Sequence, residues 1–138
     1  MDIKGIIHVS GKVGLHKIIS QGKNAVIVES LIDQKRMPVY SHTKANPLEE
    51  IGIYTYEDTL PLVDVFENIA IKEDYKKCIS QKSSKDELEN YFRQILPEYD
   101  ENRVYISDIK KVFQWYNDLY SAGLVLREKI KEKKNNEK

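Results

Sequence analysis

The chain has 138 residues, of which 41% are hydrophobic and 32% are charged. This length fits one domain or two very small ones, and the composition is typical of a soluble globular protein rather than a disordered one. The longest apolar runs, residues 25–28 and 124–126, are far shorter than the roughly 20 residues that cross a bilayer, which argues against a membrane protein. We expect cytoplasmic residence, because the amino terminus lacks secretory-signal features and the single Cys78 cannot form an intramolecular disulfide.

The net charge of zero hides an uneven distribution. Residues 1–56 contain seven Lys/Arg and five Asp/Glu, residues 57–126 contain nine and fourteen, and residues 127–138 contain six and three. An acidic middle segment repels phosphate, so nucleic acid would have to contact the first segment or the tail. Electrostatics therefore gives nucleic-acid binding little support.

The first segment has the pattern of short strands separated by turns. Apolar and β-branched runs alternate with turns that contain Gly, Asn, Asp and Ser, as in residues 20–24. The fourth run contains Pro38, which cannot donate a backbone hydrogen bond and so predicts an edge strand. The five predicted strands cover residues 3–9, 15–19, 25–31, 37–40 and 51–55.

Five short strands cannot bury both faces of an open sheet. Curling into a small SH3-like β-barrel solves this problem, and we prefer that topology. The alternative is a twisted antiparallel sheet that is covered on one face by the helices that follow.

The second segment predicts a bundle of about three helices. The first starts near Thr59, and the second starts at Ser84, whose spacing to Glu87 is that of a capping box. The third follows Ser107 and Asp108 as its N-cap and first-turn carboxylate and ends at Gly123. The pattern is lost over residues 71–83, which predicts a loop or a frayed end. The fold class is thus α+β, with a β domain (residues 1–56), a helical domain (57–126) and a charged, mobile tail (127–138).

No complete catalytic or metal-binding motif is present in the sequence. His8, His16 and His42 lie on three separate strands or loops, which is not the spacing of a metal site. Cys78 has no sequence context of a catalytic nucleophile. Gly11–Gly14 lacks the Gly-Lys-Ser/Thr ending of a phosphate loop, and residues 100–105 lack the glycine of a calcium loop. We predict no catalytic residues, metal or cofactor, and therefore no enzyme.

The second and third helices do not form a DNA-binding helix-turn-helix. Ten residues, 97–106, separate them, whereas that motif needs a turn of about three or four. The second of these helices also carries acidic residues where it would face DNA.

Aromatic and basic residues supply the candidate interaction surface. Trp115 lies to one side of the third helix's apolar stripe, where it either packs on the β segment, which we favour, or marks a partner surface. Tyr54 and Tyr56 point to one face of the fifth strand, beside the basic pair Lys35 and Arg36 if a barrel closes. These five residues are the candidate surface.

Six segments of the sequence carry a recognisable pattern: residues 10–15, 20–22, 28–32, 35–36, 104–111 and 115–117. Through these segments the chain resembles an uncharacterised family of small Bacteroidota proteins. The resemblance implies two domains of unknown function, a division near residue 50 and no assigned activity. The family pattern has an aromatic residue after Leu15, a glycine after Asp33 and an acidic tail, where this chain has His16, Gln34 and a basic tail. A partner interaction that depended on that aromatic residue or on the tail charge is not expected here.

The leading functional hypothesis is a non-enzymatic cytoplasmic binding or adaptor protein that acts through protein–protein contacts. The alternative is a nucleic-acid-associated protein that uses the tail together with basic residues of the β segment, namely Lys12, Lys17, Lys23, Lys35 and Arg36. The sequence specifies neither the partner nor the oligomeric state.

Overall fold

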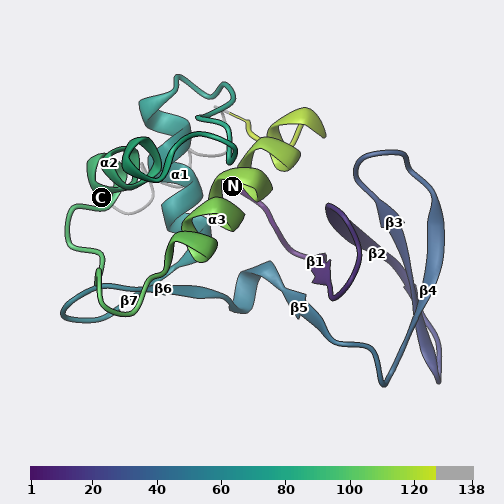
Figure 1. Ribbon diagram of the computed structural model, residues 1–138. Helices are drawn as coiled ribbons and strands as arrows, with labels where there is room; N and C mark the ends of the chain where they lie inside the picture. Colours follow the sequence, from purple (N-terminus) through teal and green to yellow (C-terminus); the bar gives the residue numbers. More distant parts are fainter. Residues whose placement is uncertain (127–138) are drawn as a thin grey trace, which may run out of the picture.

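A computed structural model describes residues 1–126 of the chain. Strands fill the first half and helices the second, so the fold is α+β as predicted (Figure 1). The elements are β1 (Ile6–Val9), β2 (Leu15–Gln21), β3 (Ala25–Ser30), β4 (Arg36–Tyr40), β5 (Ala45–Pro47), the 3-10 helix η1 (Leu48–Glu50), β6 (Gly52–Tyr54), β7 (Thr59–Pro61), α1 (Leu62–Lys72), α2 (Lys85–Ile95) and α3 (Ile106–Ser121).

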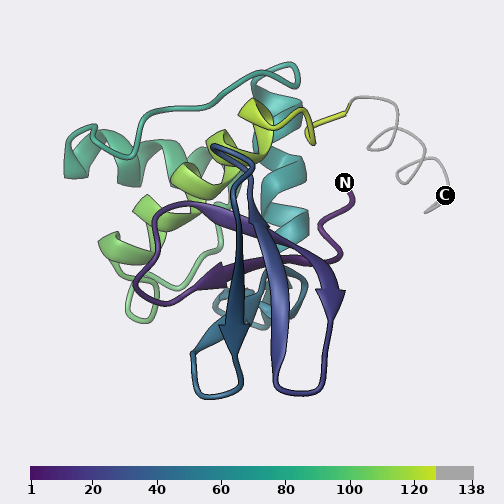
Figure 2. The same ribbon diagram turned by 90° about the vertical axis from the view of Figure 1, so that its right-hand side faces the viewer.

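The main sheet has five antiparallel strands in the order β4-β3-β2-β1-β5. As predicted from Pro38, β4 is an edge strand; β5 forms the other edge. No ladder joins these two edges within residues 1–126, so the sheet is not closed and the SH3-like barrel is not confirmed. In Figure 2 this sheet lies nearest to the viewer and the helices lie behind it.

The predicted fifth strand exists, but it does not belong to the main sheet as predicted. Residues 52–54 form β6, which pairs with β7 in a separate hairpin, and the main sheet is completed by β5 instead. Pro47 is compatible with β5 because proline is tolerated at a sheet edge, where it lies opposite Ile7.

Two helix starts also differ from the prediction. Thr59 belongs to β7, and α1 begins at Leu62, because Thr59 pairs with Tyr54 in the hairpin. Helix α3 is capped at Tyr105 rather than at Ser107, and the Asp108 carboxylate accepts the Tyr105 backbone N–H at 3.0 Å.

Other local predictions for the helices are confirmed. Ser84 caps α2, and its hydroxyl oxygen accepts the Glu87 backbone N–H at 3.2 Å. Gly123 ends α3 at φ 77°, a left-handed conformation that suits glycine. The next residue completes the helix end, because the Leu124 backbone N–H donates to the Leu119 carbonyl at 2.9 Å.

Two clusters of buried apolar side chains meet at β1. Successive strand residues point to opposite faces, so Ile6 enters the core shared with the helices, whereas Ile7 enters a smaller core within the sheet. The shared core also contains Leu15 of β2, so it draws on both halves of the chain. The smaller core consists of Ile7, Val9, Val28 and Val39.

The loop from Glu73 to Ser84 is fastened to α3. The Asn117 side chain accepts the Cys78 backbone N–H at 2.8 Å and donates to the carbonyls of Cys78 and Ile79, both at 3.3 Å. The Tyr116 hydroxyl donates to the Lys76 carbonyl at 2.6 Å. Because this segment is not helical, its backbone groups have no helical partners, and these bonds from α3 satisfy several of them.

The predicted domain boundary at residues 56 and 57 falls in the turn between β6 and β7, and the division into domains stays a prediction. The predicted tail, residues 127–138, lies outside the described residues. Among the helices of the described part, none combines the length and apolar character needed to cross a membrane.

Candidate functional site

The five candidate surface residues do not form one surface. Tyr54 and Tyr56, at the end of β6, are 46% and 57% exposed. Lys35 and Arg36 lie at the start of β4, on the opposite side of the molecule from β6 (Figure 1). Arg36 forms an exposed ion pair with Glu29 at 3.3 Å. The hypothesis that the tyrosines sit beside this basic pair is therefore wrong, because β6 does not join the sheet.

Trp115 packs between the two halves of the molecule. It is only 9% exposed, and the centre of its ring lies 5.3 Å from that of His8 on β1. This arrangement agrees with packing on the β segment, which was the preferred interpretation of this residue. Trp115 also lines a surface cleft, and Tyr54 lines the same cleft.

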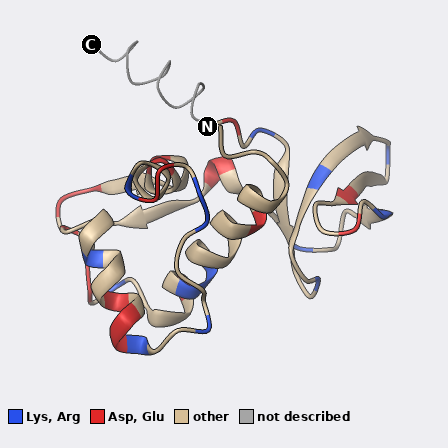
Figure 3. Cartoon of the chain, turned by 90° about the horizontal axis from the view of Figure 1, so that it is seen from above, with Lys and Arg blue, Asp and Glu red and all other residues tan. Residues whose placement is uncertain are grey.

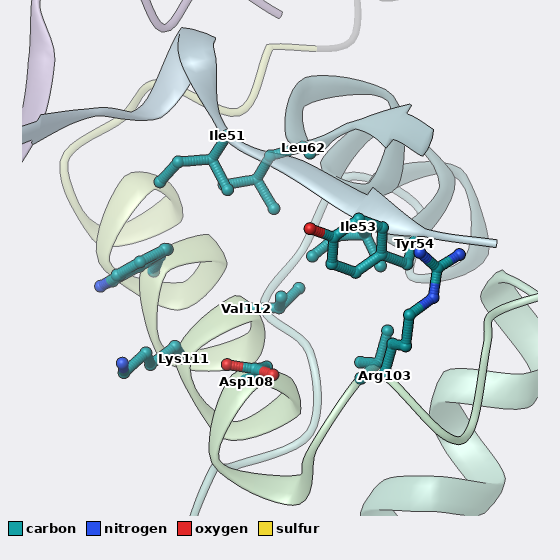
Figure 4. A pocket seen from close by; sticks show the side chains of 11 residues that line it. Ile51, Ile53, Tyr54, Leu62, Arg103, Asp108, Lys111 and Val112 are labelled. Carbon is teal, nitrogen blue, oxygen red and sulfur yellow. The ribbon is translucent and has the colours of Figure 1, made fainter. Parts of the chain in front are cut away.

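This cleft lies between β6 and α3 and has a volume of about 220 Å³ (Figure 4). Its apolar lining comes from these two elements, from residues just before each of them and from the start of α1. Four side chains with polar ends stand among these apolar groups, and Figure 4 shows Tyr54 projecting over the cleft from β6 while the charged residues of α3 lie across from it. The apolar side chains are Ile51, Ile53, Leu62, Val104, Val112 and Trp115, and the polar ones are Tyr54, Arg103, Asp108 and Lys111.

Arg103 holds Tyr54 in place at one end of the β6–α3 cleft. Its guanidinium carbon lies 4.3 Å from the centre of the Tyr54 ring, within the range of a cation–π contact. Its Nε donates to the Asp100 carboxylate at 2.8 Å, and one Nη donates to the Thr55 carbonyl at 3.4 Å. The Arg103 hydrogen bond lowers the pKa of Asp100, so this pair stays charged at neutral pH.

The charged groups of α3 in the cleft lie one turn apart. Asp108 uses one carboxylate oxygen to cap its own helix at Tyr105, and the other oxygen has no hydrogen bond within residues 1–126. Lys111 is exposed and forms no ion pair with the part of the chain that the structure describes. Arg103 and Asp108 thus both have partners, and Lys111 is the charged lining group without one in the part of the chain that the structure describes.

Sequence reasoning missed Arg103, Asp108 and Lys111 as lining residues. The spacing of residues 108, 111 and 115 places three side chains on one face of a helix, and this signal was available once Trp115 was singled out. Arg103 gave no such signal, because its contact with Tyr54 joins segments that are far apart in the sequence.

The residues considered for catalysis lie elsewhere. Neither His8, His16 nor Cys78 lines the β6–α3 cleft. Burial lowers the pKa of His8 and of His16, and it raises the pKa of the buried Cys78 thiol to about 12. The Cys78 sulfur faces the Phe113 carbonyl at 3.8 Å and is therefore a protonated packing residue. Within residues 1–126, no three His, Cys, Asp or Glu side chains are grouped as metal ligands would be.

Comparison with known proteins divides the chain into two matched stretches. Residues 3–48 match the family model Domain of unknown function (DUF5606), and residues 51–119 match Domain of unknown function (DUF6852). The chain belongs to the DUF6852 family, and the DUF5606 match precedes it in the sequence. The β6–α3 cleft falls within the DUF6852 match, and the main sheet falls within the DUF5606 match. No curated protein matches the chain.

A solved structure supports the same assignment. A solution NMR structure of a Bacteroides vulgatus protein from a structural genomics consortium is 44% identical to this chain. The match covers 89% of each chain, with a TM-score of 0.74. These findings confirm the resemblance to a Bacteroidota family whose two domains have no known function.

Proposed function

We propose that this protein is a non-enzymatic cytoplasmic binding or adaptor protein that acts through protein–protein contacts at the β6–α3 cleft. The observation that carries this proposal is the composition of the cleft. Its volume is about 220 Å³, and its lining is apolar with a few polar side chains. Such a combination suits recognition, because the apolar groups supply affinity and the polar groups fix orientation.

The polar groups in the cleft favour binding over catalysis. Asp108 caps a helix, and Arg103 forms an ion pair with Asp100, so both side chains have a structural role. The histidines and Cys78, which are the usual acid, base or nucleophile candidates, are not among the lining residues. The proposed role is therefore to hold a partner.

The arrangement of basic residues gives little support to the nucleic-acid alternative. Lys23 lies in the turn between β2 and β3, whereas Lys12 and Lys35 lie at the opposite end of the same strands. Lys17 and Arg36 flank Glu29 across neighbouring strands, so an acid separates the two cations. Figure 3 shows blue segments scattered over the hairpins rather than gathered on one face. We therefore do not propose nucleic-acid binding.

Affinity capture from the native cytoplasm with two matched variants tests this function. Lys111→Glu reverses a charge in the cleft, and Lys110→Glu makes the same change on the neighbouring residue of α3, which is also exposed but does not line the cleft. We expect the wild type and Lys110→Glu to retain the same proteins and Lys111→Glu to lose them. Failure to retain any reproducible protein, or equal retention by all three forms, would contradict the proposal.

A further inference from the structure

Strand β6 pairs on one side only. In its ladder with β7, Leu62 N–H donates to the Ile51 carbonyl at 2.9 Å and Thr55 N–H donates to the Asp58 carbonyl at 2.8 Å. Residues with odd numbers on β6 thus direct their backbone groups toward β7. Alternate residues of an antiparallel strand direct theirs to the other edge, so Gly52 and Tyr54 face away from β7.

That outer edge is occupied at only one end. The Tyr54 carbonyl accepts Asp100 N–H at 2.9 Å, and Tyr56 N–H donates to the Glu98 carbonyl at 3.0 Å, so the segment 98–100 begins a third strand. The chain then turns at Asp100, whose carbonyl accepts the next two bonds of the turn. Within residues 1–126, no hydrogen bond is made by the backbone N–H or carbonyl of Gly52 or by the backbone N–H of Tyr54.

The open part of this edge borders the cleft. Gly52 and Tyr54 are both exposed and both line it, with α3 on the opposite side. An extended segment placed between β6 and α3 would pair with Gly52 and Tyr54 and continue the ladder that stops at Asp100. Its alternate side chains would point toward the apolar lining, which has room for about one large side chain.

Charge selects the occupant. Arg103 is ion-paired with Asp100 at 2.8 Å, and Asp108 caps α3, so Lys111 is the lining cation that has no ion pair within residues 1–126. An acidic segment would supply this lysine with an ionic partner. The tail of this chain, with six Lys/Arg and three Asp/Glu in residues 127–138, has the opposite charge from the one required.

We infer that the β6–α3 cleft binds an extended, acidic peptide segment of another protein by adding it as a strand to the Gly52–Tyr54 edge. This inference rests on the proposed function and names the class of partner and the mode of binding. Backbone hydrogen bonds to the edge supply affinity, while one apolar side chain in the cleft and acidic neighbours near Lys111 supply selectivity.

Selection of a random heptapeptide display library on the full chain tests the inference. We expect enriched peptides to combine one large apolar residue with flanking Asp or Glu. The best synthetic peptide should bind Lys111→Glu at least tenfold more weakly than the wild type, and Lys110→Glu should bind it equally well. Replacing its acidic residues with Lys should restore binding to Lys111→Glu.

The mode of binding is tested by NMR with the same peptide. We expect slowed hydrogen exchange at the Gly52 and Tyr54 amides, and loss of binding when the pairing backbone nitrogen of the peptide is methylated. Binding without these two signs would overturn strand addition but leave the proposed function standing. A synthetic peptide of residues 127–138 that binds the cleft more tightly than the selected one would overturn the assignment to another protein.

The two proposals fail in different ways. If no acidic peptide is enriched while capture still retains a protein that Lys111→Glu loses, the peptide inference is wrong and the partner binds as a folded surface. If neither experiment detects binding, both proposals are wrong.

Discussion

The sheet and the helical half are stabilised by different means. The core shared with the helices contains fully buried aromatic residues that contact one another, such as Phe92 and Phe113 with ring centres 5.9 Å apart. The smaller core of the sheet contains only valine and isoleucine. Because a large side chain buries more apolar area, we expect most of the free energy of unfolding to depend on the helical side. The sheet is attached to that side through β1.

The largest expected effect comes from truncating one residue in each core. Phe113→Ala should lower the free energy of unfolding by about 3–5 kcal/mol, and Val28→Ala by about 1–2 kcal/mol, since both side chains are fully buried but differ in size. Urea unfolding measures both values. If Phe113→Ala fails to fold, Phe113→Leu serves in its place with a smaller loss. Equal losses at the two sites would remove the contrast between the cores.

The next effect concerns the fastening of the loop that follows α1. Asn117→Ala removes three hydrogen bonds to this loop and should cost about 2–3 kcal/mol. It should also increase the rate at which a thiol reagent labels Cys78, which is a buried residue of this loop. Asn68→Ala is the control, because it removes a single bond to the Ile95 carbonyl and should cost about 1 kcal/mol without affecting labelling. Unchanged labelling in Asn117→Ala would show that the loop is held by its apolar contacts.

A smaller effect on the sheet side depends on pH. His16 is 5% exposed, and its Nδ1 has no hydrogen-bond partner within residues 1–126. Burial lowers its pKa, with Lys12 and His8 acting in the same direction and Asp33 opposing them. The unfolded chain therefore binds the proton more readily, so stability should fall as the pH drops below about 6.5, the ordinary pKa of histidine.

Unfolding measurements from pH 7 to pH 5 on His16→Phe test this prediction. We expect the variant to lose less stability over this range than the wild type, because only its His8 still contributes a lowered histidine pKa near this site. His8→Phe, the matched control, should retain the part of the slope that belongs to His16. If the free energy of unfolding of His16→Phe changes with pH as steeply as that of the wild type, the prediction is wrong.

The smallest effect concerns a single turn. Gln34 lies in the turn between β3 and β4 at φ 61°, a left-handed conformation that glycine adopts without strain. Gln34→Gly should raise the free energy of unfolding by about 0.5–1 kcal/mol. Gly11→Ala is the reverse control, since Gly11 has φ 82° and open space around it, and it should be destabilised by about 1 kcal/mol. A loss of stability in Gln34→Gly would mean that the side chain's bond to the Leu31 carbonyl outweighs the strain.

Local features of the fold could be predicted from the sequence, and distant ones could not. Ser84, Pro38 and Gly123 each act through their own backbone or an adjacent turn, and each was placed correctly. Residues 52–54 could have paired either with the main sheet or with β7, and strand propensity does not distinguish these two partners. Because β6 pairs with β7, it does not close the main sheet into a barrel.

The candidate site was predicted only in part for the same reason. Tyr54 and Trp115 were recognised by residue type, but the cleft that they share exists only because β6 lies beside α3. Arg103 reaches Tyr54 through a tertiary contact with no sequence signature. Lys35 and Arg36 were included through an assumed barrel closure, and the open sheet leaves them far from the cleft.

Strand β1 has a consequence for how the chain reaches its correct alignment. Ile6 and Ile7 are neighbours in sequence but enter different cores. A slip of β1 by one residue would turn each of them to the wrong face, so both cores would be disrupted at once. Each core therefore selects the same alignment of β1, and an error in pairing during folding is penalised from both sides of the sheet.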